Sequence, residues 1–220
     1  MRGLPAFALE RFLNKNGYDA EQISYDYQNA SVKRNLVFDE KIKHGKIVRY
    51  FKGAKKRLLR SIHNKYYHDI IGLRKVSFNH FNKNIIKNSP QNYTDTNISE
   101  ANNYYDVFVT GSDQVWNPNI TDTDLSFFLD FCGKGVRRIS YAPSFGIDDF
   151  SREFSDLIRP EIAAFDSLSV REEVGREYVK REFGRDSALV CDPTMLLSAE
   201  EWSAVEREYP TGASGYILFY

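Results

Sequence analysis

Four short apolar runs in the second half of the chain constrain the fold most strongly, because each ends in a cluster of polar residues or glycine. Helical patterns at 150–165 and 172–183 separate the last three runs. Strands that alternate with helices predict an α/β fold with a parallel sheet, in which the carboxyl ends of the strands share one edge. We expect the four clusters to meet at this edge, which we call the rim. The runs and their clusters occupy residues 107–109 and 111–114, 139–142 and 143–146, 168–170 and 171–173, and 189–191 and 192–194.

The first cluster is the richest in polar side chains and predicts a binding site. Gly111 allows a sharp turn and a close approach by other atoms. Asp113 is the natural candidate for a base acting on a hydroxyl, since a carboxylate in a partly buried loop can have its pKa raised. The alternative is a carboxylate that is fixed by loop amides. The other candidates for contact with a substrate in this loop are Ser112, Gln114, Asn117 and the aromatic ring of Trp116.

The other three clusters add charged and aromatic candidates. Arg171 can fork onto a carboxylate or phosphate while Glu172 orients its guanidinium, or it can pair with an acid across the sheet. Asp192 precedes Pro193, so it either caps the next helix or faces the rim. The cluster after the second run contributes Tyr141, Ser144, Phe145 and Gly146 as substrate-binding candidates.

Several kinds of chemistry are excluded by the residue patterns. Ser112, Ser140 and Ser144 have no partner His and no G-x-S-x-G elbow, which excludes a serine hydrolase. The 4 His and 2 Cys residues have no metal-ligand spacing, so we expect no metal site. No apolar run approaches the length of about 18 residues that a membrane-spanning helix needs, and the first residues read as a charged helix rather than a secretory signal. We therefore expect a cytoplasmic protein, with the inner face of the membrane as one possible location.

A basic amphipathic helix is predicted for residues 46–70, where apolar residues recur every three or four positions. Between residues 41 and 75, about a dozen Lys and Arg residues accompany a single acid, Asp69. One interpretation is a solvated charged face. The other is a surface that contacts anionic lipid or a phosphate-bearing acceptor, which would give a peripheral membrane contact. The helix carries no known nucleic-acid-binding signature, so we expect no nucleic acid partner.

The rest of the chain is predicted to be mostly helical. A short amphipathic helix over 5–16 is followed by a strand over 19–27. Further helices are predicted at 73–87 and 201–208. A polar connection at 89–103, rich in Asn, Thr and Ser, leads into the first apolar run.

The two ends of the chain predict a fragment of a larger protein. A βαβ fold should begin with a strand that feeds its first helix, and no such strand precedes the helix at 5–16. A small flexible linker and the start of a fresh strand occupy residues 210–220. We expect residues 1–209 to form one domain with a basic helical insertion at about 40–90, and residues 210–220 to open a second domain.

Four segments, in this order and spacing, resemble the polysaccharide pyruvyl transferase family. The helix and strand near the amino end also look like the first helix and second strand of that family. The similarity covers nearly the whole chain and corresponds to the N-terminal half of the family. The four segments are residues 106–118 (DVFVTGSDQVWNP), 138–146 (RISYAPSFG), 169–172 (SVRE) and 190–194 (VCDPT).

The resemblance implies a Rossmann-like parallel sheet flanked by helices, as the N-terminal, acceptor-side domain of a GT-B-like two-domain fold. Members of the family transfer pyruvate from phosphoenolpyruvate to sugar hydroxyls of a polysaccharide or lipid-linked glycan precursor, usually as a cyclic ketal, and release phosphate. Phosphoenolpyruvate is then a co-substrate, and no other cofactor is expected. The resemblance places the donor site and the acid that protonates the enol carbon mostly in the C-terminal domain, so activity is expected of the full-length enzyme.

Two other functions stay open. A nucleotide-sugar glycosyltransferase of GT-B type would use the same architecture, and a non-catalytic domain would bind glycan without chemistry. Competition between phosphoenolpyruvate and sugar nucleotides as donors separates the first alternative from pyruvyl transfer. Glycan binding without activity would indicate the second.

Overall fold

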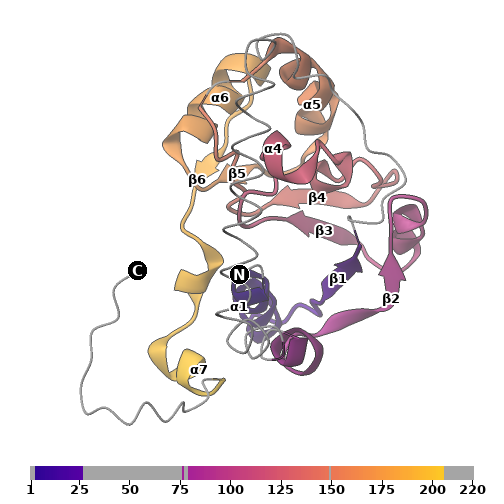
Figure 1. Ribbon diagram of the computed structural model, residues 1–220, viewed down its shortest axis with the longest axis vertical. Helices are drawn as coiled ribbons and strands as arrows, with labels where there is room; N and C mark the ends of the chain where they lie inside the picture. The colour runs from indigo at the N-terminus through magenta and orange to yellow at the C-terminus, as the bar shows by residue number, and fades with distance from the viewer. Residues whose placement is uncertain (1–2, 27–75, 77–78, 149, 206–220) are drawn as a thin grey trace, which may run out of the picture.

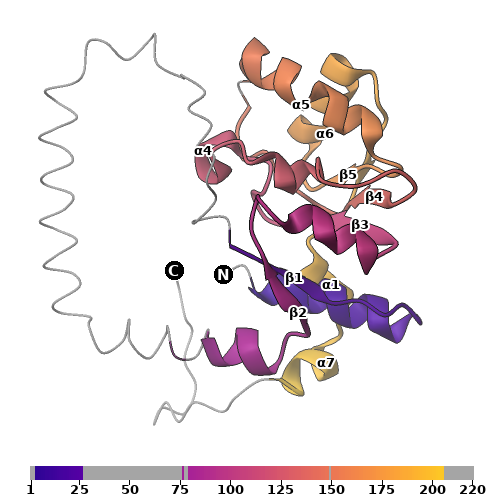
Figure 2. The same ribbon diagram turned by 90° about the vertical axis from the view of Figure 1, so that its right-hand side faces the viewer.

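The computed structural model describes residues 3–26, 76, 79–148 and 150–205. Within these residues, short strands associate as three parallel two-stranded sheets, with helices at both ends of the molecule (Figures 1 and 2). The prediction of an α/β fold with parallel strands is confirmed.

The first sheet pairs β1 (Gln22–Tyr25) with β2 (Asn88–Tyr93), and α1 (Gly3–Lys15) precedes it along the chain. The helix and the strand predicted near the amino end are therefore confirmed. Part of the helix predicted at 73–87 is also present, since residues 79–84 are helical.

The segment 89–103 corrects the sequence-based expectation of a simple polar connection. It contains most of β2 and a short helix, η2 (Ile98–Asn103). Its polar side chains take part in the strand pairing, because the Ser89 hydroxyl accepts a hydrogen bond from the backbone N–H of Ser24 at 2.9 Å. A strand of this kind has little apolar character and is not recognisable from hydrophobicity.

The second sheet pairs β3 (Val107–Thr110) with β4 (Arg137–Ser140). Phe108 and Thr110 are buried, whereas Val107 is 38% and Val109 37% exposed. The apolar run 107–109 suits a buried central strand by composition, but only its alternate residues are buried. Among the described residues, the core covers one face of β3, which is the pattern of a half-buried strand.

The third sheet pairs β5 (Ser169–Val170) with β6 (Ala188–Leu189). The two predicted helices flank it as α5 (Arg152–Ala164) and α6 (Glu173–Phe183), which contact each other at one end of the molecule (Figures 1 and 2). Ser151 caps α5 by accepting a hydrogen bond from the N–H of Phe154 at 3.1 Å.

Two buried serines join the second sheet to the third. The Ser140 hydroxyl donates to the Ser169 carbonyl at 2.8 Å, and the Ser169 hydroxyl donates to the Ser140 carbonyl at 2.7 Å. The N–H of Ser169 also donates to the Ser140 hydroxyl at 2.9 Å. Backbone hydrogen bonds also join β4 to Asp166 and Ser167, just before β5, around a bridge between Ile139 and Ser167. We call this junction the serine seam.

Short helical segments complete the described chain. The sequence pattern did not indicate the two between β3 and β4, and α7 begins two residues before the helix predicted at 201–208, whose residues 206–208 lie outside the described part. These segments are α4 (Pro118–Thr121), η3 (Leu125–Phe128), η4 (Pro193–Leu196) and α7 (Ala199–Ser203).

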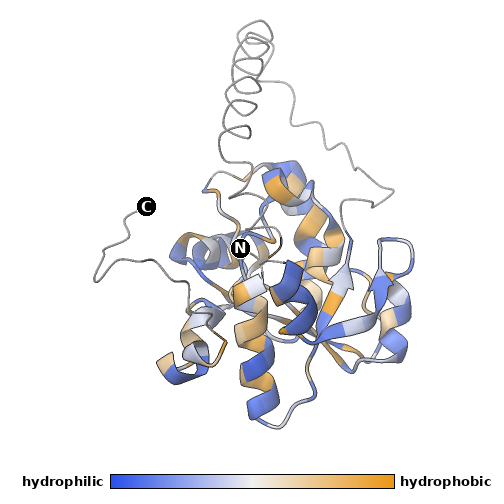
Figure 3. Ribbon diagram, turned by 60° about the horizontal axis from the view of Figure 1, so that its bottom comes forward, coloured by the Kyte–Doolittle hydropathy of each residue, from blue (hydrophilic) through white to orange (hydrophobic). Residues whose placement is uncertain are grey.

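The main core is aromatic. Trp116, only 1% exposed, stacks on Phe128 with ring centroids 5.1 Å apart and also contacts Phe145 and Phe165. A second, smaller core joins α1 to the end of the described chain, where the ring of Phe7 contacts that of Trp202. Hydrophobic and hydrophilic residues alternate along the helices in Figure 3, as expected for helices that cover a core on one side.

Several sequence-based expectations concern residues that the structure does not describe. The basic helix at 46–70, with its proposed membrane contact, and the linker and strand at 210–220 lie outside the described residues. The GT-B-like arrangement of two domains stays a prediction. Over the part of the chain that is described, no helix combines the length and apolar character needed to cross a bilayer.

Candidate functional site

The predicted rim exists, and its centre is a hydrogen-bonded group formed by three of the four clusters. The Ser112 hydroxyl, after β3, donates to Oδ2 of Asp192 at 3.2 Å. Arg171, after β5, donates to the same oxygen at 3.1 Å and to Oε1 of Glu172 at 3.1 Å. The remaining cluster joins through the backbone, because the N–H of Arg171 donates to the Pro143 carbonyl at 3.2 Å. The carboxyl ends of β3, β4, β5 and β6 therefore converge as predicted.

Asp192 performs both roles that the sequence left open. Its Oδ1 accepts the N–H of Thr194 at 3.0 Å and the Thr194 hydroxyl at 2.8 Å, so it caps η4. Its Oδ2 accepts from Ser112 and Arg171 at the rim. Burial alone would raise the pKa of Asp192, but these hydrogen bonds outweigh burial and hold the pKa below its usual value. Asp192 is therefore a firmly ionised anchor of the rim.

Arg171 pairs with acids, as one of its two interpretations predicted. Burial opposes its charge, but the hydrogen bonds to Glu172 and Asp192 outweigh burial and raise the pKa of Arg171. Its side chain is 27% exposed, so one face of the guanidinium still reaches solvent. Glu172 is the N-cap residue of α6 but makes no side-chain capping bond, which leaves its carboxylate to orient Arg171.

Gly111 has the close backbone contact that its sequence position predicted. A Cβ atom at Gly111 would lie 2.0 Å from the carbonyl oxygen of Tyr141. Its φ of +120° is also a conformation that L side chains rarely adopt. The loops after β3 and β4 can therefore touch only because this residue has no side chain.

Replacing Gly111 with alanine is expected to lower the free energy of unfolding by about 2–4 kcal/mol, since overpacking and backbone strain add. Urea unfolding followed by circular dichroism measures the loss. Gly184 also has a positive φ, of +65°, but a Cβ there would meet no atom within 4 Å. Gly184→Ala is thus the matched control, with backbone strain alone. Equal losses for the two variants would contradict the contact with Tyr141.

Asp113, the candidate base, lies at a sharp turn of the same loop. Its φ is +67°, and its Oδ1 accepts a hydrogen bond from the N–H of Gln114 at 2.9 Å. Its carbonyl accepts from the N–H of Ser144 at 2.8 Å, which joins the first cluster to the second. The carboxylate is thus held by a loop amide, as the alternative interpretation predicted. Its Oδ2 makes no hydrogen bond with any other described residue.

Two of the predicted cleft residues belong to the core instead. Trp116 and Phe145 are each 1% exposed and pack against each other, so neither forms an aromatic wall of the rim. The Nε1–H of Trp116 donates to the Phe127 carbonyl at 2.9 Å, which satisfies its one polar atom.

Three further candidates hold the loops in shape. Asn117 caps α4 by accepting the N–H of Asn119 at 2.9 Å, and its side-chain amide donates to Gln114 at 3.1 Å. Gly146 has a φ of +60°, and a Cβ there would come within 2.6 Å of the Gln114 side chain. These residues therefore fix the conformation of the loops that form the rim.

Ser144 is the least explained of the candidates. It is 1% exposed, and its hydroxyl oxygen has no hydrogen-bond partner among the described residues. A buried hydroxyl without a partner costs about 1–3 kcal/mol and calls for an explanation such as an absent water or ligand.

Cys191 and Thr194 are rim residues that the sequence analysis did not single out. Burial, and next the neighbouring Cys191 thiol, raise the pKa of the half-buried Tyr141. Thr194 contributes two hydrogen bonds to Asp192. Cys191 ends the fourth apolar run and Thr194 lies in the cluster that follows it, so their position in the sequence was the signal that could have identified them.

The comparison with protein families decides what kind of protein carries this rim. The family model described as polysaccharide pyruvyl transferase matches residues 4–218, which is nearly the whole chain. This chain belongs to the polysaccharide pyruvyl transferase family. The comparison with curated proteins and the comparison with solved structures each found no significant match. Membership of the polysaccharide pyruvyl transferase family indicates a transferase with a glycan acceptor.

The rim of this polysaccharide pyruvyl transferase family member is rich in hydrogen-bonding groups. In the described segments, no three His, Cys, Asp or Glu side chains gather where a metal ion could bind. The charged groups of the rim are the carboxylates of Asp113, Glu172 and Asp192 and the guanidinium of Arg171.

Asp192→Asn is expected to reduce the free energy of unfolding by about 1–3 kcal/mol at neutral pH, because hydrogen bonds to a charged group are lost. The pKa of Asp192 is depressed in the folded state, so its stabilisation is present above the usual Asp pKa and disappears as pH falls through the depressed value. The difference between wild type and variant should therefore shrink in acid.

Urea unfolding measures the difference in the free energy of unfolding between wild type and variant. It is carried out at neutral pH, near the usual Asp pKa of about 3.9, and below that pKa. Asp186→Asn is the matched control, because Asp186 is 90% exposed and pairs with Lys180 at the surface. A loss for Asp192→Asn that is the same at every pH would show that the ionised carboxylate is not what stabilises the rim.

Proposed function

We propose that this protein forms the acceptor-binding part of an enzyme that transfers pyruvate from phosphoenolpyruvate to sugar hydroxyls of a polysaccharide or lipid-linked glycan. Family membership supports the reaction class. The observation that carries the acceptor side is the charge of the rim. Among the described residues of its four clusters, Arg171 is the one cation and pairs with Glu172 and Asp192, while Asp113 adds a third carboxylate.

This balance suits a neutral sugar better than a phosphate donor. The carboxylates of Glu172 and Asp192 already neutralise the positive charge of Arg171. The described rim residues therefore carry a net negative charge, which repels a multiply charged anion. In contrast, carboxylates accept hydrogen bonds from the hydroxyls of a sugar, and the hydroxyls of the protein both donate to them and accept from them. The donor would therefore bind to other, cationic groups of the enzyme.

The proposed reaction is balanced as follows. Two sugar hydroxyl oxygens form bonds to the central carbon of phosphoenolpyruvate, while the bond between that carbon and the phosphate oxygen breaks. The proton of one sugar hydroxyl adds to the methylene carbon of phosphoenolpyruvate, which becomes a methyl group as the double bond is lost. The proton of the other hydroxyl leaves with the phosphate. The Asp113 carboxylate acts as the base that takes a proton from an attacking sugar hydroxyl.

Asp113 is suited to this step by its free oxygen. Oδ1 is fixed by the N–H of Gln114, so the side chain has a defined direction, while Oδ2 makes no bond to a described residue. Ser112, next to it, is linked through Asp192 to Arg171. The sugar would then be positioned by a rigid group of charged and polar side chains.

The test is a transfer assay on the full protein as encoded in its source, with phosphoenolpyruvate and a panel of glycans. We expect phosphate release that depends on the glycan, together with a ketal methyl signal in the NMR spectrum of the product. Sugar nucleotides in excess should not compete with phosphoenolpyruvate. Sugar transfer from a nucleotide donor would support a glycosyltransferase instead, and glycan binding without phosphate release would support a non-catalytic domain.

A further inference from the structure

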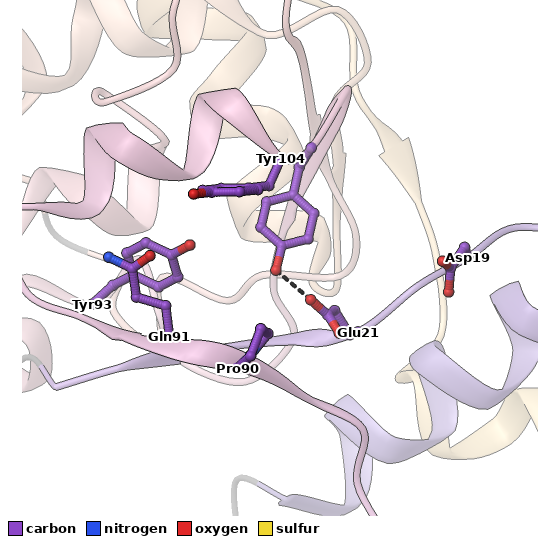
Figure 4. A pocket seen from close by; sticks show the side chains of 7 residues that line it. Asp19, Glu21, Pro90, Gln91, Tyr93 and Tyr104 are labelled. Carbon is purple, nitrogen blue, oxygen red and sulfur yellow. Dashed lines mark hydrogen bonds between the residues drawn. The ribbon is translucent and has the colours of Figure 1, made fainter.

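A hollow of about 350 Å³ lies at the end of β3 opposite to the rim. It opens beside β2 and beside the residues that lead into β1 and β3 (Figure 4). This volume is at the lower end of the range for small-molecule sites. It is lined by Asp19, Glu21, Pro90, Gln91, Tyr93, Tyr104 and Tyr105.

The lining is acidic and lacks a cation. Asp19 is the more remote of its two carboxylates and pairs with Lys87 outside the lining (Figure 4). Glu21 lies nearer to the tyrosines and accepts a hydrogen bond from the hydroxyl of Tyr105 (Figure 4). No ion pair to Glu21 is formed by any Lys, Arg or His side chain of the described chain. Lys87 acts on Glu21 electrostatically from outside the lining, so among the described residues the carboxylate of Glu21 has no direct cationic partner inside the hollow.

The charge of Glu21 also contributes to the pKa values of the neighbouring tyrosines. Burial raises the pKa of Tyr105, and the hydrogen bond to Glu21 and its charge raise it further. Burial also raises the pKa of Tyr93, with smaller contributions from Tyr104, Glu100 and Glu21. Burial is the largest cause of both shifts, and the smaller contribution of Glu21 to each places its negative charge within reach of both tyrosines, which favours a positively charged occupant.

The three tyrosines form the aromatic part of the lining. Tyr104 is 70% exposed, so the face of its ring is accessible to a ligand. Tyr93 is 2% exposed, and its hydroxyl has no hydrogen-bond partner within the described residues although it faces the hollow (Figure 4). Aromatic faces beside a carboxylate are the usual means of binding an ammonium ion.

We propose that this hollow binds a small organic cation that carries an ammonium group. Glu21 would neutralise the cation, the ring of Tyr104 would contact it by a cation–π interaction, and the Tyr93 hydroxyl would accept from or contact its polar substituents. The site is distinct from the rim, which lies beyond the carboxyl end of β3, and it does not depend on the proposed transfer reaction.

The experiment measures binding of charged and neutral probes of the same shape to the full chain. Choline is compared with 3,3-dimethyl-1-butanol, in which carbon replaces the charged nitrogen. Glucosamine, protonated, is compared with glucose to distinguish an amino sugar from a quaternary ammonium as the source of the charge. Chemical-shift changes of the lining tyrosines report on the site. We expect at least one cation to bind about tenfold more tightly than its neutral partner, the ratio that corresponds to about 1.4 kcal/mol.

Variants show whether the named residues are responsible. Glu21→Gln retains an acceptor for Tyr105 and removes the charge, so it should weaken cation binding about tenfold and leave the neutral probes unchanged. Tyr104→Ala should weaken it too, while Tyr104→Phe should retain it. Glu177→Gln, on the exposed face of α6, is the matched control and should have no effect.

The proposal is overturned if the neutral probes bind as tightly as the cations, or if Glu21→Gln binds choline and glucosamine as wild type does. Circular dichroism spectra of all variants verify the fold. Because Tyr104 is mostly exposed, its replacement leaves the core intact, so loss of binding in Tyr104→Ala is not caused by unfolding.

Discussion

Replacing Asp113 with asparagine is expected to slow pyruvyl transfer about 10²–10⁴-fold, the usual contribution of a positioned general base. Asp113 has a φ of +67°, a conformation that asparagine also tolerates. The amide oxygen of asparagine can still accept the N–H of Gln114, now bonded at 2.9 Å. The substitution therefore removes the charge and the proton-accepting group while it preserves the loop. Turnover in the phosphate-release assay, together with thermal unfolding, measures the effect.

Asp122 provides a matched control for this substitution. It also has a positive φ, of +50°, and it ends α4 at an exposed position. Asp122→Asn should leave both turnover and stability near those of wild type. If Asp113→Asn retained wild-type turnover with phosphoenolpyruvate and a glycan acceptor, Asp113 would not be the base. The rim would then bind the acceptor without taking its proton.

Trp116→Ala is expected to lower the free energy of unfolding by about 3–5 kcal/mol, the usual loss when a large aromatic side chain is removed from a core. Trp116 contacts three aromatic rings, those of Phe128, Phe145 and Phe165. Its removal leaves a cavity between them. The Phe127 carbonyl loses one donor but retains the Thr110 hydroxyl at 2.7 Å, so the loss is mainly one of packing. Urea unfolding followed by circular dichroism measures it.

Trp202→Ala is the corresponding control in the smaller core. Trp202 is only half-buried, contacts Phe7 and donates to the Thr194 carbonyl at 3.1 Å. Its loss should cost clearly less than that of Trp116, because less apolar surface is exposed. An equal or smaller cost for Trp116→Ala would contradict its place at the centre of the main core.

The sheet edge was predictable because strand direction follows from chain order. Apolar runs separated by helices require parallel strands, and parallel strands place their carboxyl ends together. The contacts of Ser112, Arg171 and Asp192 confirm this inference. β2 was not predictable, because a strand with Pro90 and two Asn residues has no apolar alternation to reveal it.

The roles of individual rim residues were less predictable than their position. Sequence order cannot tell which way a side chain points from a loop, so Trp116 and Phe145 were expected in a cleft but lie in the core. Asp192 had two competing interpretations, and both hold because its two oxygens bind different partners. The hollow around Glu21 gave no sequence signal, since its lining comes from three separated segments.

The serine seam has a consequence for which substrates the rim can accept. Ser112 follows the second sheet, while Arg171 and Asp192 belong to the third, so the aperture between them is set by how the two sheets are joined. That junction depends on the hydroxyls of Ser140 and Ser169 as well as on backbone hydrogen bonds. A larger or smaller side chain at either serine would widen or narrow the aperture without altering any rim residue. Under the proposed function, acceptor preference can therefore change through two side chains that lie behind the rim.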